Sequence, residues 1–373
     1  MTMNKIFTFI SIVLLFVSCK FLRPTNTDVK ISRFKIGNSD GYDGVGFFND
    51  SKKVLYFANG ELYPFLNNYT VLQNNENMTV IDSKGKELFK YKTLPIMEWS
   101  YSEGFFSSYW EHDWVDVYNA RGKIINLRTA RPVKNGFCVL YNSDNKMMYY
   151  TSPEGKCLKT KNGDIYYSEY CGDFSNGYAV VGENDLYGII NISAEEIVNK
   201  NFSFIGNLKY EYATASIKGT KKKYRTAPEY GLIDMHGNWI VDPNYYQIMA
   251  ISSENAVIKT TSNNNKENYG WGIINLKSKI IMYYEKTINL QSDFESGEIF
   301  FNDTAIFSYQ KYSSTYGLIN ARGNIVLENI CEKIEPFPDN GYWQVLINDK
   351  WMLFKEGEGV LDPEEYLDFR SIK

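Results

Sequence analysis

Few side chains in this 373-residue sequence are of the kinds that build a catalytic or metal-binding centre. Histidine, a common metal ligand and general base, occurs only at His112 and His236, and His236 falls at a turn that should face water. The sequence has no glycine-rich phosphate loop, no G-x-S-x-G turn and no H-E-x-x-H motif. The 44 Asp and Glu residues leave a carboxylate pair for glycoside hydrolysis open, but their spacing singles out no pair. We therefore predict that the protein is not an enzyme and has no catalytic residue, metal site or cofactor.

Four cysteines in the body of the chain have two interpretations. None of Cys138, Cys157, Cys171 and Cys331 lies in a C-x-x-C pair, which argues against a zinc ribbon or a thioredoxin-type site. In an exported chain a disulfide can form among the first three. The alternative, which we favour slightly, is that all four are small buried apolar residues.

An aromatic-rich stretch between residues 99 and 118 contains the candidate ligand-binding side chains. Exposed rings can stack on the faces of sugars, so Trp110 and Trp114 are candidate glycan-binding residues. Large rings also bury much area and commonly fill the interior of a protein. Core packing is therefore the favoured interpretation of this stretch, and a glycan platform is the alternative.

The first residues have the pattern of an export signal. Lys5 provides a positive charge, residues 6–17 are almost wholly apolar, and Ser18 precedes Cys19. The apolar run is shorter than the roughly 20 residues that a membrane-spanning helix needs. Residues 16–19 resemble the cleavage box of bacterial lipoprotein signal peptides, which implies that Cys19 becomes lipid-modified. Each buried methylene of an acyl chain contributes about 0.8 kcal/mol, so the lipid would be a membrane tether. The alternative is an ordinary secretory signal cut near Ser18.

Composition favours strands and a single repeat domain. Aromatic residues make up 16% of the chain, including 30 Tyr and 23 Phe, and such residues are enriched in strands. The net charge of −4 gives no electrostatic reason to expect nucleic acid as a partner. The chain is long for one globular core, yet no proline-rich or serine-rich linker divides it. An elongated or toroidal repeat domain accommodates this length.

Four segments share one motif, in which an aromatic residue is followed by glycine, two aliphatic residues and then Asp or Asn. The aromatic–glycine pairs are Tyr187 with Gly188, Tyr230 with Gly231, Trp271 with Gly272, and Tyr316 with Gly317. Glycine in a strand lets a neighbouring ring or backbone lie close against it. We therefore interpret these pairs as structural.

A turn follows each of these strands. Asp234 precedes Gly237 by three residues, and Asn320 precedes Gly323 in the same way. A type I turn favours Asp or Asn first and Gly fourth, so each copy is predicted to be a β-hairpin. Ala194 and Ser278 occupy the glycine position in two copies, where a left-handed conformation costs roughly 1 kcal/mol, so these turns are expected to be reshaped. Equivalent turns recur every 33 to 45 residues, which indicates about eight copies of three or four short strands each.

With these motifs the chain resembles the WG-repeat family of bacterial proteins. The resemblance covers about residues 77–373 and is strongest between 184 and 325. Only Trp271 with Gly272 shows the eponymous pair, and the first copies lack the aromatic–glycine pair. The repeats predict an all-β fold of tandem β-hairpins. A propeller-like toroid is favoured over an open β-solenoid, because a unit of about 40 residues matches a propeller blade and closure removes exposed edges.

These observations predict three segments: a lipoprotein-type signal peptide at 1–18, a tether and lead-in at 19–45, and a WG-type β-repeat domain at 46–373. The leading hypothesis is a non-catalytic binding or scaffold protein, lipid-anchored in the bacterial cell envelope, with the outer membrane favoured. It would present its repeat surface to an envelope protein partner. The alternatives are a glycan-binding lipoprotein and, less favoured, an unrecognised glycoside hydrolase.

Overall fold

A computed structural model gives the fold of most of the chain. It describes residues 30–65, 68–75, 77–92, 98–102, 105–109, 115–119, 124–129, 135–142, 145–153, 155–217, 229–260, 270–292, 299–301, 303–309 and 313–370. These residues divide into two compact units. Unit 1 combines residues up to 72 with 82–85 and those from 289 onward, and unit 2 combines 73–81 with 86–288.

The described residues form short strands and one short helix. Unit 1 contains β1 (Ile31–Asn38), β2 (Gly41–Asn49), β3 (Val54–Ala58), β27 (Asn289–Leu290), β28 (Phe300–Phe301), β29 (Thr304–Ser308), β30 (Tyr316–Asn320), β31 (Ile325–Cys331), β32 (Lys333–Ile334), β33 (Trp343–Ile347), β34 (Lys350–Lys355), β35 (Gly359–Leu361) and helix α2 (Pro363–Tyr366). A further sheet consists of β4 (Glu61–Leu62), β5 (Tyr69–Asn74), β6 (Asn77–Asp82) and β7 (Glu87–Lys92).

Unit 2 contains the strands from the middle of the chain. They are β8 (Glu98–Ser102), β9 (Phe105–Tyr109), β10 (Val115–Asn119), β11 (Ile124–Thr129), β12 (Cys138–Asn142), β13 (Met147–Thr151), β14 (Tyr167–Ser168), β15 (Tyr170–Cys171), β16 (Tyr178–Glu183), β17 (Leu186–Asn191), β18 (Glu196–Phe202), β19 (Phe204–Ile205), β20 (Tyr212–Ser216), β21 (Tyr230–Asp234), β22 (Trp239–Tyr245), β23 (Gln247–Ala250), β24 (Asn255–Lys259), β25 (Trp271–Asn275) and β26 (Ile281–Tyr283).

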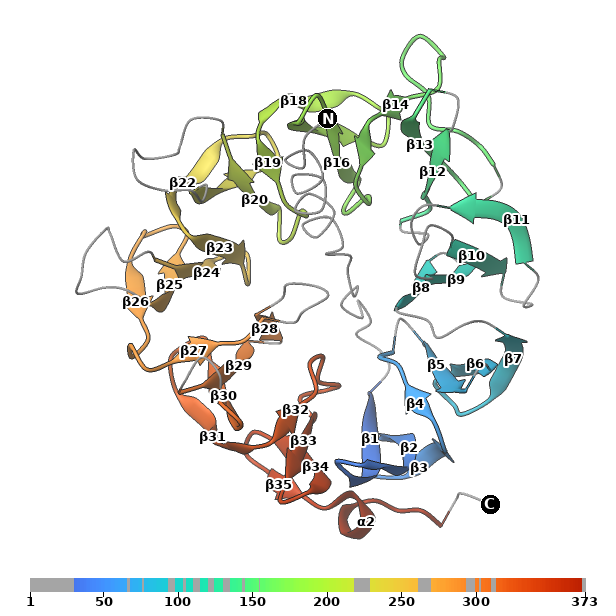
Figure 1. The fold of residues 1–373 in the computed structure, drawn as a ribbon, viewed down its shortest axis with the longest axis vertical. Helices are drawn as coiled ribbons and strands as arrows, with labels where there is room; N and C mark the ends of the chain where they lie inside the picture. The colour runs from blue at the N-terminus through green and yellow to red at the C-terminus, as the bar shows by residue number, and fades with distance from the viewer. Residues whose placement is uncertain are drawn as a thin grey trace, which may run out of the picture. The chain divides into compact units, whose positions relative to one another are not determined.

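Successive strands pair into small sheets, as the hairpin turns predict. Among the described residues there are nine sheets of three to five strands (Figure 1). The order β15-β16-β17-β18 recurs as β19-β20-β21-β22, β23-β24-β25-β26 and β32-β33-β34-β35. Neighbours run antiparallel, as β16 does with β17 and β24 with β25. The predicted all-β class of tandem hairpins is confirmed, whereas closure into a toroid stays a prediction.

The first sheet includes a segment that was expected to be a lead-in. Residues 31–45 form β1 and the first part of β2, which pair in register from Ile31 with Asn49. The sequence pattern concealed β1, because Arg33 and Lys35 interrupt its apolar residues. Both of these charged side chains are nevertheless buried.

Apolar clusters between neighbouring sheets form the core of each unit. In unit 2, Ile189 and Val198 of one sheet pack with Ile205 and Ile233 of the next. In unit 1, Phe34 and Phe48 of the first sheet pack with Tyr342 and Leu353, and β1 lies beside β34 (Figure 1).

Backbone contacts also fasten the end of the described chain to the first sheet. The N–H of Val54 donates to the carbonyl of Asp368 at 3.0 Å, and the N–H of Asp368 donates to the carbonyl of Lys52 at 2.8 Å. No helix in the described part of the chain is both long and apolar enough to cross a membrane.

Candidate functional site

The hairpin turns have the geometry that the Asp/Asn-to-Gly spacing predicts. Gly237 and Gly323 have φ of 82° and 84°, and their N–H groups donate to the carbonyls of Asp234 and Asn320 at 3.1 and 3.0 Å. The Asp234 carboxylate also accepts hydrogen bonds from the N–H groups of His236 and Asn238, at 2.8 and 2.9 Å. Asp or Asn therefore starts these turns because its side chain satisfies the backbone inside the turn.

The two copies without glycine differ from each other. Ala194 keeps the turn in the left-handed conformation, with φ of 57°. In the other copy the residue with positive φ is Lys279, at 60°, and not Ser278. The N–H of Lys279 donates to the carbonyl of Asn275 at 2.9 Å, which spans four residues instead of the three of the other turns. Only the second turn is reshaped, by one additional residue, so the left-handed position expected at Ser278 is corrected to Lys279.

The glycine of each aromatic–glycine pair faces the backbone of the next strand. A Cβ atom on Gly188 or Gly231 would lie 2.3 Å from the carbonyl oxygen of Val198 or Val241. On Gly317 and Gly272 the corresponding distances to carbonyl oxygens are 2.6 and 2.7 Å. The β17–β18, β21–β22 and β30–β31 pairings shift register at this point. Glycine is thus needed because the bulged neighbouring strand fills the space of a side chain.

The aromatic partners of these glycines pack locally. The rings of Tyr187 and Tyr230 meet Tyr170 and Phe204 edge to face, each at a centroid distance of 5.6 Å. Burial raises the pKa of Tyr187 to about 12, and the pKa of Tyr230 is also raised. Such shifts indicate rings that are partly withdrawn from water.

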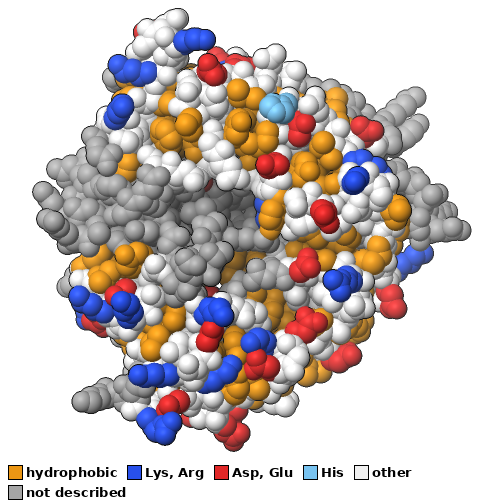
Figure 2. Space-filling model, turned by 180° about the vertical axis from the view of Figure 1, so that it is seen from behind, with side chains coloured by type: hydrophobic (Ala, Val, Ile, Leu, Met, Phe, Trp, Pro, Cys, Tyr) orange, Lys and Arg blue, Asp and Glu red, His pale blue; other side chains and the backbone are white. Residues whose placement is uncertain are grey.

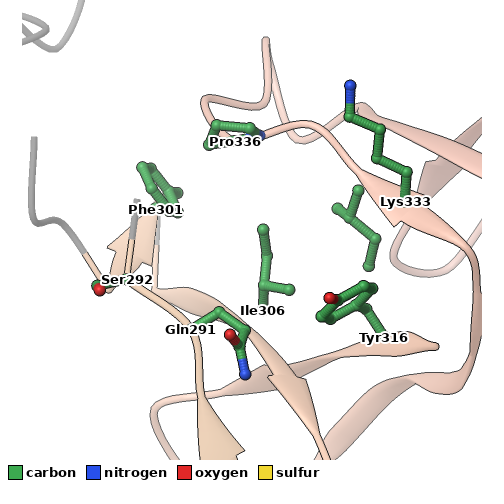
Figure 3. Close-up of a pocket in the computed structure, with 8 residues that line it drawn as sticks. Gln291, Ser292, Phe301, Ile306, Tyr316, Lys333 and Pro336 are labelled. Atoms are coloured by element: carbon green, nitrogen blue, oxygen red, sulfur yellow. The ribbon is translucent and has the colours of Figure 1, made fainter. Parts of the chain in front are cut away.

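The fourth aromatic, Tyr316, lines a pocket in unit 1 (Figure 3). The pocket has a volume of about 260 Å³. Five of its lining side chains are largely apolar, namely Phe301, Ile306, Tyr316, Ile334 and Pro336. Gln291, Ser292 and Lys333 add polar groups. A concave site with mainly apolar walls and few polar groups is the usual form of a small-ligand site.

The apolar wall of this pocket is fixed by the core beneath it. The Phe301 ring contacts Phe337 and Trp343 edge to face, at centroid distances of 4.9 and 6.1 Å. Ile306 and Tyr316 pack against the same core cluster. The wall is therefore preorganised by rings that have little room to move.

One carboxylate beside the pocket is shared by two lysines. The Oε1 atom of Glu335 lies 2.9 Å from the Nζ of Lys35 and 2.9 Å from the Nζ of Lys333. Burial disfavours the ionised carboxylate, but the two ammonium groups outweigh this effect and lower the pKa of Glu335 to about 2. Lys333 is the more exposed of the two lysines, at 56%.

A buried ion pair holds the segment that follows. Arg33 Nε donates to Asp339 Oδ2 at 2.6 Å, and both side chains are only 7% exposed. A second guanidinium nitrogen donates to the carbonyl of Phe337 at 2.9 Å. Phe337 has a φ of 63°, a strained conformation for a bulky residue, which the surrounding contacts must maintain. Arg33 and Lys35 of β1 therefore position the 335–339 segment beside the pocket.

A second polar cluster in unit 1 joins the C-terminal helix to the first sheet. The hydroxyl groups of Tyr342 and Tyr366 lie 2.9 Å apart, and Tyr366 donates to Glu358 at 2.5 Å. Lys355 lies 2.6 Å from the same carboxylate, and Lys52 also contacts Tyr342. The hydrogen bonds from Lys355 and Tyr366 lower the pKa of Glu358 to about 2. These groups satisfy one another, so we interpret the cluster as a clasp between the two chain ends.

The remaining candidate residues from the sequence are the five cysteines and two tryptophans. Cys19, Trp110 and Trp114 lie outside the described residues. Cys138, Cys171 and Cys331 are buried free thiols, and Cys157 is a free thiol that is partly exposed. The structure thus corrects the disulfide alternative for Cys138, Cys157 and Cys171, because none of these thiols is paired. Among the described residues there is no group of three or more His, Cys, Asp or Glu suited to a metal.

Sequence reasoning interpreted Tyr316 as structural and missed the other residues that line the pocket. The sequence signal was present in β1, where Arg33 and Lys35 alternate with Phe34 and Ile36. Two like charges at i and i+2 on an otherwise apolar strand indicate buried acidic partners, but not which ones.

The fold and its repeated turns define an all-β protein built from tandem antiparallel hairpins. The family model of the WG containing repeat matches residues 167–187, 230–262 and 316–351. These segments are therefore WG-type repeats, which confirms the resemblance seen in the sequence.

Several solved structures are similar to this chain at low sequence identity, and no curated protein sequence matches it. The crystal structure of the eukaryotic initiation factor is 11% identical, with a TM-score of 0.51, covering 88% of this chain and 95% of that one. The computationally designed Ika8 protein is 10% identical, with a TM-score of 0.46, covering 85% and 99%. BamB from Moraxella catarrhalis is 10% identical, with a TM-score of 0.40, covering 87% and 99%. At sequence identities this low, the similarity concerns the fold and says nothing about function.

Proposed function

We propose that this protein is a non-catalytic binding or scaffold protein that recognises an envelope protein through its repeat surface. WG repeats in three segments between residues 167 and 351 support a role in binding, since repeat arrays present extended surfaces. The observation that carries the proposal is an exposed, uncharged edge strand, β26.

Strand β26 is the last strand of its sheet and carries no charged residue. Ile280 immediately before it is 70% exposed, and Met282 and Tyr283 are exposed as well. The equivalent strand β22 carries Asp242 and Pro243, which discourage pairing with another chain. An edge without such residues is suited to accept an extended strand from a partner. Figure 2 shows one face of the molecule, on which apolar side chains lie among charged and other polar ones.

The proposal includes the predicted address of the protein. Export and acylation of Cys19 would place it on a membrane of the bacterial cell envelope, with the outer membrane favoured. Because four-stranded antiparallel sheets that follow one another in sequence are the form of propeller blades, we also propose propeller-like closure.

The test is cross-linking of the tagged full-length protein in its own envelope, followed by mass spectrometry. We expect a near-stoichiometric protein partner that is lost when Ile280→Lys and Met282→Lys are combined. Ile192→Lys is the matched control, because Ile192 is 56% exposed but lies in a turn outside any strand. Cys19→Ala should release the protein from the membrane fraction. Retention of the partner by the β26 variant would overturn the proposed surface.

A further inference from the structure

The outer side of β26 presents a defined set of backbone groups. The carbonyl of Ile280 and the N–H of Tyr284 both make hydrogen bonds to β25, at 2.9 and 3.0 Å. Successive residues of a strand direct their hydrogen-bonding groups to opposite sides, so the intervening Ile281 and Tyr283 direct theirs away from β25. In the part of the chain that the structure describes, no strand pairs with this side of β26 (Figure 1).

Opposite charges flank this strand. Lys279 precedes it and Glu285 follows it, and both side chains are exposed. The Lys279 ammonium donates to two neutral carbonyl groups, including that of Ile240 at 2.7 Å. Residues 280–284, which lie between the two charges, are all uncharged. An antiparallel strand that fits this edge therefore has an acidic residue opposite Lys279, a basic residue opposite Glu285 and uncharged side chains between them.

We propose that the strand accepted by β26 is β26 of a second copy of this chain. Twofold antiparallel pairing about Met282 places Ile281 opposite Tyr283 of the second copy, so the outward backbone groups of both residues are satisfied. The same pairing places Lys279 opposite Glu285 of the second copy at both ends. A shift by one residue would set outward backbone groups against inward ones, so the register is specified. This inference rests on the proposed function, because it names the partner of the same edge.

Mixed isotope labelling tests this pairing directly. Equal amounts of heavy-nitrogen-labelled and unlabelled full-length protein in detergent are treated with a carbodiimide, which joins an amine to a carboxylate without a spacer. We expect cross-linked peptides that join Lys279 of one copy to Glu285 of the other, recognised in mass spectrometry by their mixed isotope content. Absence of such mixed peptides would overturn the proposal.

Charge reversal tests the register. Lys279→Glu and Glu285→Lys each set like charges opposite one another at both ends, so each variant alone should associate with itself at least about tenfold more weakly in sedimentation velocity. A mixture of the two variants should associate as tightly as the wild type, because each end then joins opposite charges. Lys277→Glu is the matched control, since this exposed lysine lies opposite the uncharged Thr287 in the proposed register. Thermal unfolding verifies that each variant is folded, and unchanged self-association of Glu285→Lys would refute the register.

The outcomes separate this inference from the proposed function. Pairing between copies that is abolished when Ile280→Lys and Met282→Lys are combined supports both. If a different envelope protein is lost from that combined variant and the copies do not pair, β26 is a docking edge for that protein and the second-copy assignment is wrong. If neither partner is found, both proposals fail.

Discussion

Two junctions between neighbouring sheets are held together by different chemistry. In unit 2, the sheet ending in β18 meets the next sheet through the apolar side chains of Ile189, Val198, Ile205 and Ile233. In unit 1, the first sheet meets the last through an apolar cluster and also through Arg33 and Lys35, which are paired with Asp339 and Glu335.

The difference shows how each junction determines the alignment of its two sheets. Two similar repeats can pack through equivalent aliphatic positions, because those positions recur in every copy. The first sheet lacks the aromatic–glycine motif, and its neighbour comes from the far end of the chain. A buried ion pair contributes little net stability compared with apolar packing, but it strongly penalises a wrong alignment that leaves a charge unpaired. The charged junction therefore selects one register for the chain ends.

The largest expected effect comes from breaking the buried pair on one side. Arg33→Met leaves the Asp339 carboxylate buried without its partner and should lower the free energy of unfolding by about 3–5 kcal/mol. Chemical denaturation followed by circular dichroism measures this loss. Arg370→Met is the control, because Arg370 pairs with Asp368 but is 90% exposed, and a surface pair is worth about 0–1 kcal/mol. Equal effects of the two substitutions would show that burial does not distinguish these pairs.

The shared carboxylate gives the charged junction a dependence on acid. Glu335 has its pKa lowered from 4.5 to about 2, so the folded state binds its proton less readily than the unfolded state. Its contribution is therefore present above pH 4.5 and is lost as the pH falls towards 2. The difference corresponds to about 3 kcal/mol at neutral pH.

Glu335→Gln tests this dependence. The variant should unfold at lower denaturant concentration than the wild type at pH 7, and the two midpoints should converge between pH 4.5 and about 2. A constant difference between the two proteins across that range would show that the carboxylate charge is not what stabilises the junction.

The same contrast explains which features could be read from the sequence. Turns such as the one ending at Gly237 and strands such as β21 depend on neighbours a few residues away, so the local pattern predicts them. The role of Gly231 follows from a strand that begins only eight residues later, at Trp239. The pocket depends on residues far apart in the chain, such as Gln291 and Lys333, that line it together, and the charged junction joins residues about 300 positions apart. No periodicity in one strand specifies such a partner, so these features required the structure.

Within a repeat, the glycine of the motif should be the most sensitive position. Gly231→Ala places a Cβ atom 2.3 Å from the carbonyl oxygen of Val241, so the β21–β22 bulge must shift, at a cost of about 2–3 kcal/mol. Gly41→Ala is the control, because a Cβ there would meet no atom within 4 Å. Thermal unfolding should show a clear decrease only for Gly231→Ala. Similar melting temperatures of the two variants would refute the steric role of the motif glycine.

The smallest effect should come from the turn that joins β21 to β22. Asp234→Ala removes the acceptor for the N–H groups of His236 and Asn238, which should cost about 1 kcal/mol. Asp234→Asn keeps an oxygen in the same place, and Asn320 makes the corresponding bonds to Arg322 and Asn324 in another copy, at 3.0 Å each. The Asn variant should therefore unfold close to the wild type in chemical denaturation. If instead both variants lost the same stability, the charge of Asp234, and not its hydrogen-bond geometry, would stabilise the turn, and the Asp and Asn copies of the repeat would not be equivalent.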